Sequence, residues 1–307
     1  KGWISVDDFF GKAISANNRA RLGWEDYETA KGFALKLNHK SGNDWREYIK
    51  SNKVFTVGRV GSPEILSTDM FDQGVQIPKH ISDLLKNNAG VYGDNIDGFC
   101  REYLNAIKSS DIQIVWPMFN IKPSQDRLFG KYCLNSVKSD NRCVEPFYFD
   151  DPWSYELRGK KVLVINPFSE SIEKQYKNRK HLWQNDKILP EFDLITYKNI
   201  QSIGDSGPHS SWLESLEFMK SEISDIDFDI ALLGCGGYGM PLASFIKNEL
   251  NKPSIYIGGG LQILFGIKGD RWDNHEDVGK FYNSYWSRPL QTERPDAANS
   301  VEGGCYW

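Results

Sequence analysis

The fold is decided by residues 229–260, which read DIALLGCGGYGMPLASFIKNELNKPSIYIGGG. The apolar run Asp229–Leu233 predicts a buried strand, and Ser254–Ile257 predicts a second one. Between them, a glycine-rich turn leads into a helical pattern over Pro241–Leu250. Because a strand, a helix and a strand in this order pack with a right-handed crossover, the stretch predicts two parallel strands covered by a helix.

The same alternation continues upstream. Apolar runs predict further strands at 54–58, 112–116, 161–165 and 194–197. Helical spacing predicts helices over 26–37, 78–86, 96–109, 169–178 and 212–223, the fourth with Ser169 as its N-cap. Residues 120–158 are rich in Asp, Asn, Pro and aromatic residues and predict irregular structure. We therefore expect an α/β, Rossmann-like fold, with a mainly parallel sheet, helices on both faces and a helical segment at the N-terminus.

The pattern changes at Arg158–Lys160, after which strands and helices alternate regularly. We expect an N-terminal half, residues 1–157, that holds the helical segment and the first α/β elements. Residues 158–307 are the expected nucleotide-binding half. Because 307 residues also suit one large α/β domain, the halves are expected either as separate domains or as one continuous domain.

Composition and charge exclude several classes of protein. Hydrophobic residues make up 40% of the chain and charged residues 25%, which rules out a disordered or collagen-like protein. The net charge of −4 provides no basic field for nucleic acid. No apolar run approaches the roughly 18 residues of a membrane span, and Lys1–Trp3 does not begin a signal peptide. The five cysteines lack the spacing of a zinc site and fit a reducing compartment.

The turn within the deciding stretch contains the pattern G-x-G-x-x-G at Gly234, Gly236 and Gly239. Between a strand and a helix, this pattern lets a phosphate approach the backbone and the helix N-terminus. A nicotinamide dinucleotide also requires an acidic residue about 20 residues further on, where this chain has Tyr256–Gly260. The pattern therefore favours another phosphate-bearing ligand, and a purely structural turn is the alternative.

Three polar or glycine-rich turns follow predicted strands, at 166–169, 234–239 and 258–260. Ligands of open α/β sheets bind beyond the carboxyl ends of the strands, so these turns are expected to line one crevice. The alternative is that the turns need glycine only for their shape. The residues assigned to the phosphate-bearing ligand on this basis are Asn166, Ser169, Gly234, Gly236, Gly237, Tyr238, Gly239, Gly258, Gly259 and Gln262.

A fourth turn follows the strand at 54–58 and reads Arg59-Val-Gly-Ser-Pro-Glu64. Arg59 suits bidentate pairing with a phosphate, and Gly61 and Ser62 lie beside it in the sequence. Glu64 suits a general base, a metal ligand or a carboxylate attracted to a helix N-terminus. The spacing alone favours the last of these three roles.

Other polar residues are weaker candidates. His209 follows the strand at 194–197 in a polar loop, where an acid or base and a solvated loop histidine are both consistent with the sequence. Asp270 and Arg271 stand beside Trp272, which suits either a substrate groove or an ordinary surface ion pair. The patterns G-x-S-x-G and G-x-x-x-x-G-K-[ST] are absent, which argues against an α/β-hydrolase and a P-loop NTPase.

These motifs together resemble the bacterial glycosyltransferases of the GT-D fold, which occur in capsule, O-antigen and adhesin glycosylation clusters. The turn Arg59–Glu64 stands where that family has R-F-G-D-G-E. The unit Asp229–Gly258 is similar to its later strand, turn, helix and strand, and residues 261–272 and 302–307 are similar to a branch from polysaccharide clusters. The resemblance covers residues 53–70 and 158–307.

The resemblance implies transfer of a sugar from a nucleotide-sugar donor to a glycan or lipid-linked acceptor in surface polysaccharide synthesis. It implies Glu64 as the catalytic carboxylate and Arg59, Gly61 and Ser62 with the strand-end turns as the donor site. It also implies Mn²⁺ or Mg²⁺ at Glu64, yet Ser62 replaces the family's Asp and leaves one carboxylate for an ion that prefers several oxygen ligands. The residues expected on the acceptor side are His209, Asp270, Arg271 and Trp272. We expect the protein in the cytoplasm or peripherally at the inner face of the membrane.

Two other classes of function stay open. The glycine pattern also fits a nucleotide-dependent oxidoreductase, which would bind a nicotinamide or a flavin. The high aromatic content, 13% of the chain, also fits a non-catalytic carbohydrate-binding module, which would never release nucleotide from an activated sugar.

The aromatic residues divide into two groups by their position. Those on predicted helices are expected in the core: Phe99, Tyr103, Phe218 and Phe245. Those at strand ends and in irregular segments are expected to form a platform for an acceptor sugar: Trp116, Phe119, Phe147, Tyr148, Phe149, Trp153 and Trp272.

Overall fold

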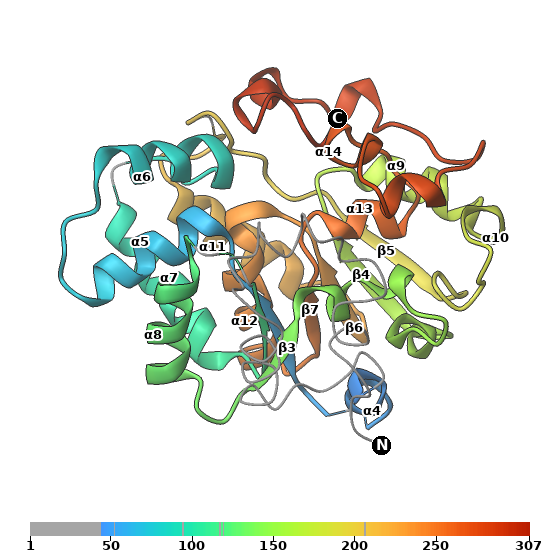
Figure 1. Ribbon diagram of the computed structural model, residues 1–307, viewed down its shortest axis with the longest axis horizontal. Helices are drawn as coiled ribbons and strands as arrows, with labels where there is room; N and C mark the ends of the chain where they lie inside the picture. The colour runs from blue at the N-terminus through green and yellow to red at the C-terminus, as the bar shows by residue number, and fades with distance from the viewer. Residues whose placement is uncertain (1–43, 52, 94, 117, 119, 206) are drawn as a thin grey trace.

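The computed structural model describes residues 44–307 except 52, 94, 117, 119 and 206 (Figure 1). The helix expected over 26–37 and the expected platform residue Phe119 lie outside the described residues. A seven-stranded sheet forms the centre of the fold, in the order β3-β2-β1-β7-β6-β4-β5. The strands are β1 (Thr56–Arg59), β2 (Ile112–Val115), β3 (Val137–Asp140), β4 (Lys161–Ile165), β5 (Asp193–Tyr197), β6 (Ile230–Leu233) and β7 (Ser254–Tyr256).

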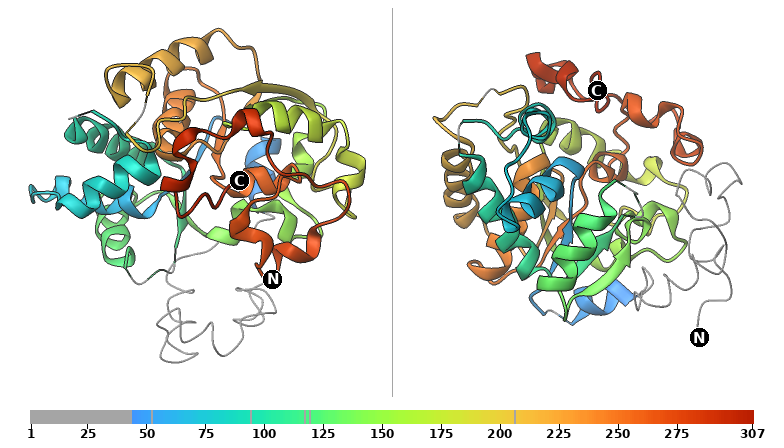
Figure 2. Two further views of the ribbon diagram at one scale, coloured as in Figure 1. Left: turned by 90° about the horizontal axis from the view of Figure 1, so that it is seen from above. Right: turned by 60° about the vertical axis from the view of Figure 1, so that its left-hand side comes forward.

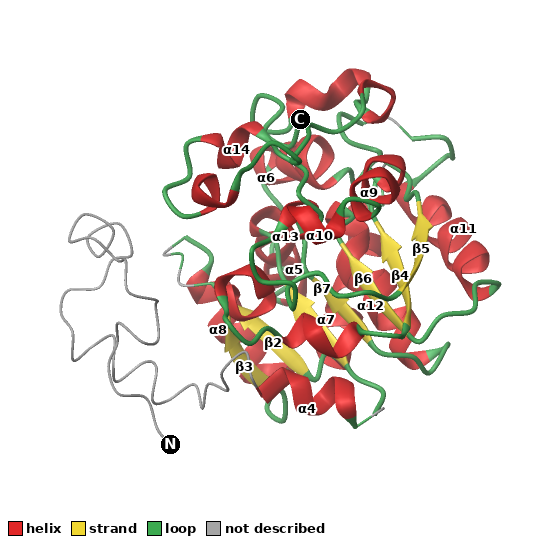
Figure 3. Cartoon of the chain, turned by 90° about the vertical axis from the view of Figure 1, so that its right-hand side faces the viewer, coloured by secondary structure: helices red, strands yellow, loops and turns green. Residues whose placement is uncertain are grey.

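Every strand of this sheet runs parallel to its neighbours, so all carboxyl ends lie at one edge (Figure 3). Strands from before and after residue 158 belong to the same sheet. They meet where β1 pairs with β7, in the register Thr56↔Ser254 and Val57↔Ile255. Residues about 200 positions apart in the chain are thereby brought side by side at the middle of the sheet.

Helices cover both faces of the sheet, as the sequence predicts. The longer ones are α5 (Ser62–Asp72), α7 (Ile96–Ser109), α8 (Lys122–Tyr132), α9 (Ser169–Tyr176), α11 (Trp212–Ser224) and α12 (Gly239–Asn248). The shorter ones are α4 (Asp44–Lys50), α6 (Lys79–Leu84), α10 (Arg179–Leu182), α13 (Gly260–Leu264) and α14 (Asp270–Asp273), with a π-helical turn η1 (Leu85–Ala89). The 3₁₀ turns are η2 (Asn141–Val144), η3 (Pro146–Tyr148), η4 (Trp153–Leu157), η5 (Gly236–Tyr238), η6 (Val278–Phe281), η7 (Gln291–Glu293) and η8 (Asp296–Ser300).

The alternation of side chains along the strands creates two cores. In β4, Val162 and Val164 face one core, and Leu163 and Ile165 face the other. The first core is closed by α9, α13, the segment 143–157 and the C-terminal segment, and the second by α5, α7, α11 and α12. Because both faces are covered, the strands are apolar almost throughout, and the predicted α/β, Rossmann-like fold is confirmed.

The sequence analysis errs mainly between residues 120 and 158, which are not wholly irregular. This segment contains α8 and the edge strand β3. The only apolar side chains that α8 buries are Leu128 and Phe129, and β3 reads Val-Lys-Ser-Asp, so neither displays a clear apolar period. Ser169 is also not an N-cap, because it is the first residue of α9 and Phe168 precedes the helix.

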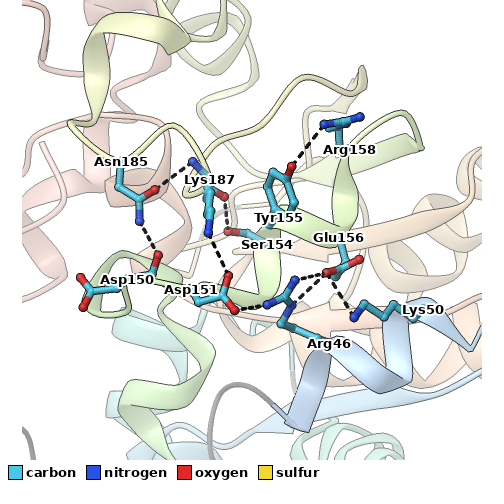
Figure 4. A network of polar contacts seen from close by, with 10 residues as sticks. All are labelled: Arg46, Lys50, Asp150, Asp151, Ser154, Tyr155, Glu156, Arg158, Asn185 and Lys187. Carbon is cyan, nitrogen blue, oxygen red and sulfur yellow. Dashed lines mark hydrogen bonds and ion pairs between the residues drawn. The ribbon is translucent and has the colours of Figure 1, made fainter.

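The helix α4 is tied to the segment 150–158 by a polar network (Figure 4). Arg46 pairs with both Asp151 and Glu156, and its Nε donates to Glu156 at 2.9 Å. Lys187 approaches Asp151 from the other side, with Nζ 3.3 Å from Oδ1. These groups are partly exposed, so we expect them to fix the position of α4 more than to stabilise the fold.

The C-terminal segment after α13 lies over the carboxyl edge of the sheet, as the view from above shows (Figure 2). It packs Trp307 edge-on against Phe168, with ring centroids 5.9 Å apart. Among the described residues, the helices are too short or too polar to cross a lipid bilayer.

The joint between α5 and α8 provides a test of the fold. Asp69 of α5 is buried and accepts hydrogen bonds from Ser124 (2.7 Å) and from Arg127 Nε (3.0 Å). We expect Asp69→Ala to lower the free energy of unfolding by about 2 kcal/mol, because charge-assisted bonds are lost. The exposed pair Lys79–Asp83 is the control, and Asp83→Ala should cost at most about 0.5 kcal/mol. Equal losses in urea unfolding would contradict this assignment.

Candidate functional site

The candidate site lies at the carboxyl ends of the adjacent strands β1 and β7. Arg59 is the last residue of β1, and Gly258–Gly260 follow β7. An alanine Cβ at Gly258 would lie 2.1 Å from Arg59 Nη1, so the guanidinium packs directly on this turn. Gly258 has φ +73°, which glycine adopts without strain. The predicted proximity of the first turn to the last strand end therefore appears in the structure.

Arg59 is a partly buried cation with no counter-ion among the described residues. Its guanidinium carbon lies 4.5 Å from the ring centroid of Trp116. Three buried polar atoms here lack a hydrogen-bond partner among the described residues: Arg59 Nε, Trp116 Nε1 and Glu64 Oε2. Such orphaned atoms are costly unless a ligand or water satisfies them, so their grouping makes this place the candidate binding site.

Glu64 lies in the first turn of α5, with 7% of its surface exposed. Its carboxylate folds back onto Gly61, where an added Cβ would lie 2.2 Å from Oε2. Burial raises the pKa of Glu64, although a hydrogen bond to its own backbone and the charge of Arg59 act in the opposite direction. The Gly61 N–H donates to the Tyr103 hydroxyl at 3.2 Å, which fixes the start of the helix. Ser62 follows as the first helical residue.

A second carboxylate, Glu145, reaches the turn Gly258–Gly260 after β7 and was missed by the sequence analysis. It lies between η2 and η3, and an added Cβ on Gly260 would be 2.8 Å from its Oε1. Removal from water raises the pKa of Glu145 to about 7, against the opposing charges of Arg59 and Arg142. A single glutamate in an irregular segment displays no pattern, so no sequence signal could have revealed it.

The glycine pattern after β6 serves packing. A Cβ on Gly237 would be 2.6 Å from the Ala89 carbonyl oxygen, and one on Gly239 would be 2.2 Å from the Tyr256 ring. The Gly236 carbonyl accepts a hydrogen bond from the Tyr256 hydroxyl at 2.8 Å. Protein atoms thus pack tightly against Gly237 and Gly239, whereas Gly236 is exposed. This favours the structural alternative for the pattern.

Two further members of this group are also used internally. Gly234 lies against the Gly258 carbonyl, with 2.8 Å from an added Cβ to that oxygen. Tyr238 is buried, bonded to Ser202 at 2.8 Å and stacked on Trp212, so its side chain faces away from any ligand.

The turn at 166–169 leads into a helix N-terminus where the sequence predicted a phosphate. A carboxylate of the protein itself binds there. The buried carboxylate of Glu293 accepts from the backbone N–H of Glu170 at 2.8 Å and of Ser171 at 3.3 Å. Asn166 joins two strand ends, because its Nδ2 donates to the Gly234 carbonyl at 2.9 Å. Ser169 is buried below this cap. We conclude that Asn166 and Ser169 organise the edge of the sheet.

Gln262 is likewise a structural residue. Its buried side-chain nitrogen lies within hydrogen-bond distance of three carbonyl oxygens, those of Ile267 (3.4 Å), Lys268 (3.3 Å) and Tyr306 (3.1 Å). It thereby holds the C-terminal end of the chain against α13.

Two of the expected acceptor residues lie beside the site. Trp272 packs on Gly259, with a ring carbon 3.3 Å from an added Cβ. Arg271 stacks on Tyr306, its guanidinium carbon 4.7 Å from the ring centroid, and Tyr306 itself reaches within 2.9 Å of the same Cβ position. Asp270 forms an ion pair with Arg288, in which Oδ1 lies 3.1 Å from Nη2.

His209 belongs to another part of the molecule. Its Nδ1 is 2.8 Å from the Ser215 hydroxyl, and its ring packs on Phe218 of α11. None of these contacts involves Arg59, Glu64 or Glu145.

The residues of the site do not by themselves form a metal centre. Within the described part of the chain, no three His, Cys, Asp or Glu side chains converge on one point. The charged side chain that interacts with Glu64 is Arg59, a cation. The donor set therefore does not fit the Mn²⁺ or Mg²⁺ site that the resemblance implies.

The expected aromatic platform is only partly present. Trp153, Phe147 and Trp272 are buried in the first core. Among the described members of the expected set, Trp116 contacts Arg59. Among the aromatic residues expected in the core, Phe99, Tyr103 and Phe245 are buried as predicted, whereas Phe218 is 45% exposed on α11.

Comparison with known proteins gives one structural likeness. No family model matches the sequence, and no curated protein matches it. The chain is similar to a solved structure described as the selenomethionine-substituted structure of domain of unknown function 1792 (DUF1792), with 13% sequence identity and a TM-score of 0.39. The likeness covers 73% of this chain and 80% of the other. At this identity and TM-score it assigns no activity to the chain.

Gly258 allows a test of the site with a matched control. Gly159 has nearly the same φ, +74°, but an added Cβ there meets nothing within 4 Å. Alanine at either position should lower the free energy of unfolding by about 1–2 kcal/mol through backbone strain. Only Gly258→Ala should also displace Arg59 and weaken the binding of pyrophosphate, used as the probe anion, in calorimetry. Equal binding by the two variants would exclude Arg59 as the anion contact.

Proposed function

We propose that the protein is a glycosyltransferase that moves a sugar from a nucleotide-sugar donor to a glycan or lipid-linked acceptor in surface polysaccharide synthesis. The donor diphosphate would bind at Arg59, where β1 and β7 end. The proposed setting is the cytoplasm, with a lipid-linked acceptor presented at the inner face of the membrane. The observation that carries the proposal is the unpaired guanidinium of Arg59.

An arginine in this state favours an anionic ligand for physical reasons. Partial burial removes water from the guanidinium, and the described residues offer it no carboxylate within 4.0 Å. A charge removed from water is stabilised when an opposite charge binds it. The planar guanidinium matches two phosphate oxygens at once, and Trp116 behind it restricts its orientation.

In the proposed reaction, Arg59 stabilises the negative charge that develops on the leaving diphosphate. This is the main electrostatic requirement of transfer from a nucleotide sugar. Arg271 lies near Gly259 through its contact with Tyr306, but it is ion-paired with Glu302, so Arg59 is the cation proposed for the diphosphate. Glu64 is proposed as the essential carboxylate, and its negative charge interacts with the positive charge of Arg59.

Two observations make an oxidoreductase the weaker alternative. Gly234, Gly237 and Gly239 are packed against the protein itself, and no acidic residue follows β7 to bind a ribose. A non-catalytic carbohydrate-binding module would bind a glycan at this site but would release no nucleotide from an activated sugar. Both alternatives are separated from the proposal by the experiments below.

The first experiment measures thermal stability with UDP, GDP, CDP, dTDP and their common sugar conjugates, with and without Mn²⁺. One nucleotide should raise the unfolding free energy by about 2.7 kcal/mol at 100 times its Kd. Arg59→Ala should weaken that nucleotide at least about tenfold, since a charge-assisted contact is lost. Arg158→Ala, on the surface, is the control and should bind normally. A shift with NAD or flavin alone would instead support the oxidoreductase.

The second experiment addresses Glu64. We expect Glu64→Gln to retain nucleotide binding but to lower release of nucleotide from the donor sugar about 100-fold or more, measured by a coupled nucleotide assay. Glu249→Gln, on the exposed end of α12, is the matched control. Release at the wild-type rate in Glu64→Gln would remove this residue from the reaction.

A further inference from the structure

The site contains two carboxylates whose surroundings differ. Glu64 is buried, whereas Glu145 is partly exposed, and both interact with the charge of Arg59. Two titratable groups of the same type in unequal environments commonly divide the roles of a reaction between them. The partly exposed one is the one that a second substrate can reach.

We propose that Glu145 is the catalytic base on the acceptor side of the site, a role that rests on the proposed glycosyl transfer. A hydroxyl oxygen of the acceptor forms a bond to the anomeric carbon of the donor sugar, and its proton passes to a carboxylate oxygen of Glu145. The bond between the anomeric carbon and the diphosphate oxygen breaks, and its electron pair leaves with the diphosphate held by Arg59. Glu64 keeps the place proposed for it above, as the carboxylate on the donor side beside Arg59.

The backbone holds Glu145 firmly in place. It stands between two 3₁₀ turns whose adjoining residues, Val144 and Pro146, are both buried. Asp140 accepts a hydrogen bond from the Arg142 N–H at 2.8 Å and so caps the first of these turns. The side chain of Glu145 therefore projects from a rigid segment toward Gly260.

The Glu145 carboxylate has no bonding partner in the described part of the chain. Among the described residues, Glu145 makes no side-chain hydrogen bond and no ion pair within 4.0 Å. The nearby cation Arg142 is already paired with Asp277, with Nη2 2.9 Å from Oδ2. Partial exposure without a partner leaves both oxygens of Glu145 available to an incoming hydroxyl.

The acidity of the group suits the role. Removal from water raises the pKa of Glu145 to about 7, which is well placed for accepting a proton near neutral pH. The groups that face it are Arg59 and Arg142, which lower its pKa, Asp140, which raises it, and the Tyr148 hydroxyl. Asp140 is buried and its own pKa is raised to about 6, so it is the group to separate from Glu145 in a pH profile.

The positions of Arg59 and Glu145 also separate the proposed leaving group from the proposed acceptor hydroxyl. Arg59 packs on Gly258 and Glu145 on Gly260, so the anion contact and the base stand two residues apart along one turn. Gly259 lies between them, facing Trp272 and Tyr306. In a single displacement, with Glu145 as the base and the diphosphate leaving toward Arg59, the acceptor hydroxyl attacks the anomeric carbon from the face opposite the leaving group, which predicts inversion at that carbon.

The experiment uses the full chain and the sugar nucleotide that releases nucleotide in the wild-type protein, with water as the acceptor when no glycan is known. Because a base must be deprotonated, wild-type kcat/KM should rise with pH through an apparent pKa near 7 and level off above it. Glu145→Gln should lower kcat by about 10²–10⁴ and abolish this rise, while the thermal shift with nucleotide stays unchanged. Asp140→Asn should retain the rise, which excludes Asp140 as its source. Proton NMR should show the first sugar anomer inverted.

The outcomes separate the inference from the function on which it rests. If the wild-type protein releases nucleotide but Glu145→Gln does so at the same rate with the same pH profile, Glu145 is not the base, although the transferase proposal stands. Retention of the anomeric configuration would overturn the single displacement with the same consequence. If the wild-type protein releases nucleotide from no activated sugar, both proposals fail together.

Discussion

The pairing of β1 with β7 is the interaction on which the rest of the structure depends. It is a short contact, in which Thr56 and Val57 lie beside Ser254 and Ile255, and the Thr56 and Ser254 hydroxyls are 2.7 Å apart. Since it joins the first described strand to the last one, it closes one sheet from two halves of the chain. Without it, Arg59 would not lie against the Gly258 turn, and the candidate site would not exist.

The chemistry of the place where β1 and β7 end depends on charged groups that are partly removed from water. Arg59, Glu64 and Glu145 are held close to one another in a partly dry place, yet none is joined to another by an ion pair of 4.0 Å or less among the described residues. An ion pair among these groups would have paired their charges within the protein. Their separation instead keeps one cation and two carboxylates available to a ligand, a state that is stabilised only when the ligand arrives.

The C-terminal segment decides which of the strand ends remain available. Glu293 caps the helix after β4, Gln262 holds the Tyr306 carbonyl, and Trp307 covers Phe168. In the glycine turn after β6, Ala89 packs against Gly237 and Tyr256 packs against Gly239. Of the four strand ends that seemed equivalent in the sequence, two are packed largely by the protein's own groups, whereas Arg59, Glu64 and Glu145 lie beside the ends of β1 and β7 without an ion pair among the described residues.

The sequence by itself determined the α/β class, the parallel direction of the strands and the position of most helices, because apolar runs and helical periods are local properties of the chain. It also identified Arg59 and Glu64 as unusual residues after a strand. Only the tertiary structure decided that α8 and β3 form, that the G-x-G-x-x-G turn is packed by protein atoms, and that Glu145 joins the site. These depend on contacts between residues far apart in the chain, and neither composition nor spacing encodes which distant side chain will fill the space above a glycine.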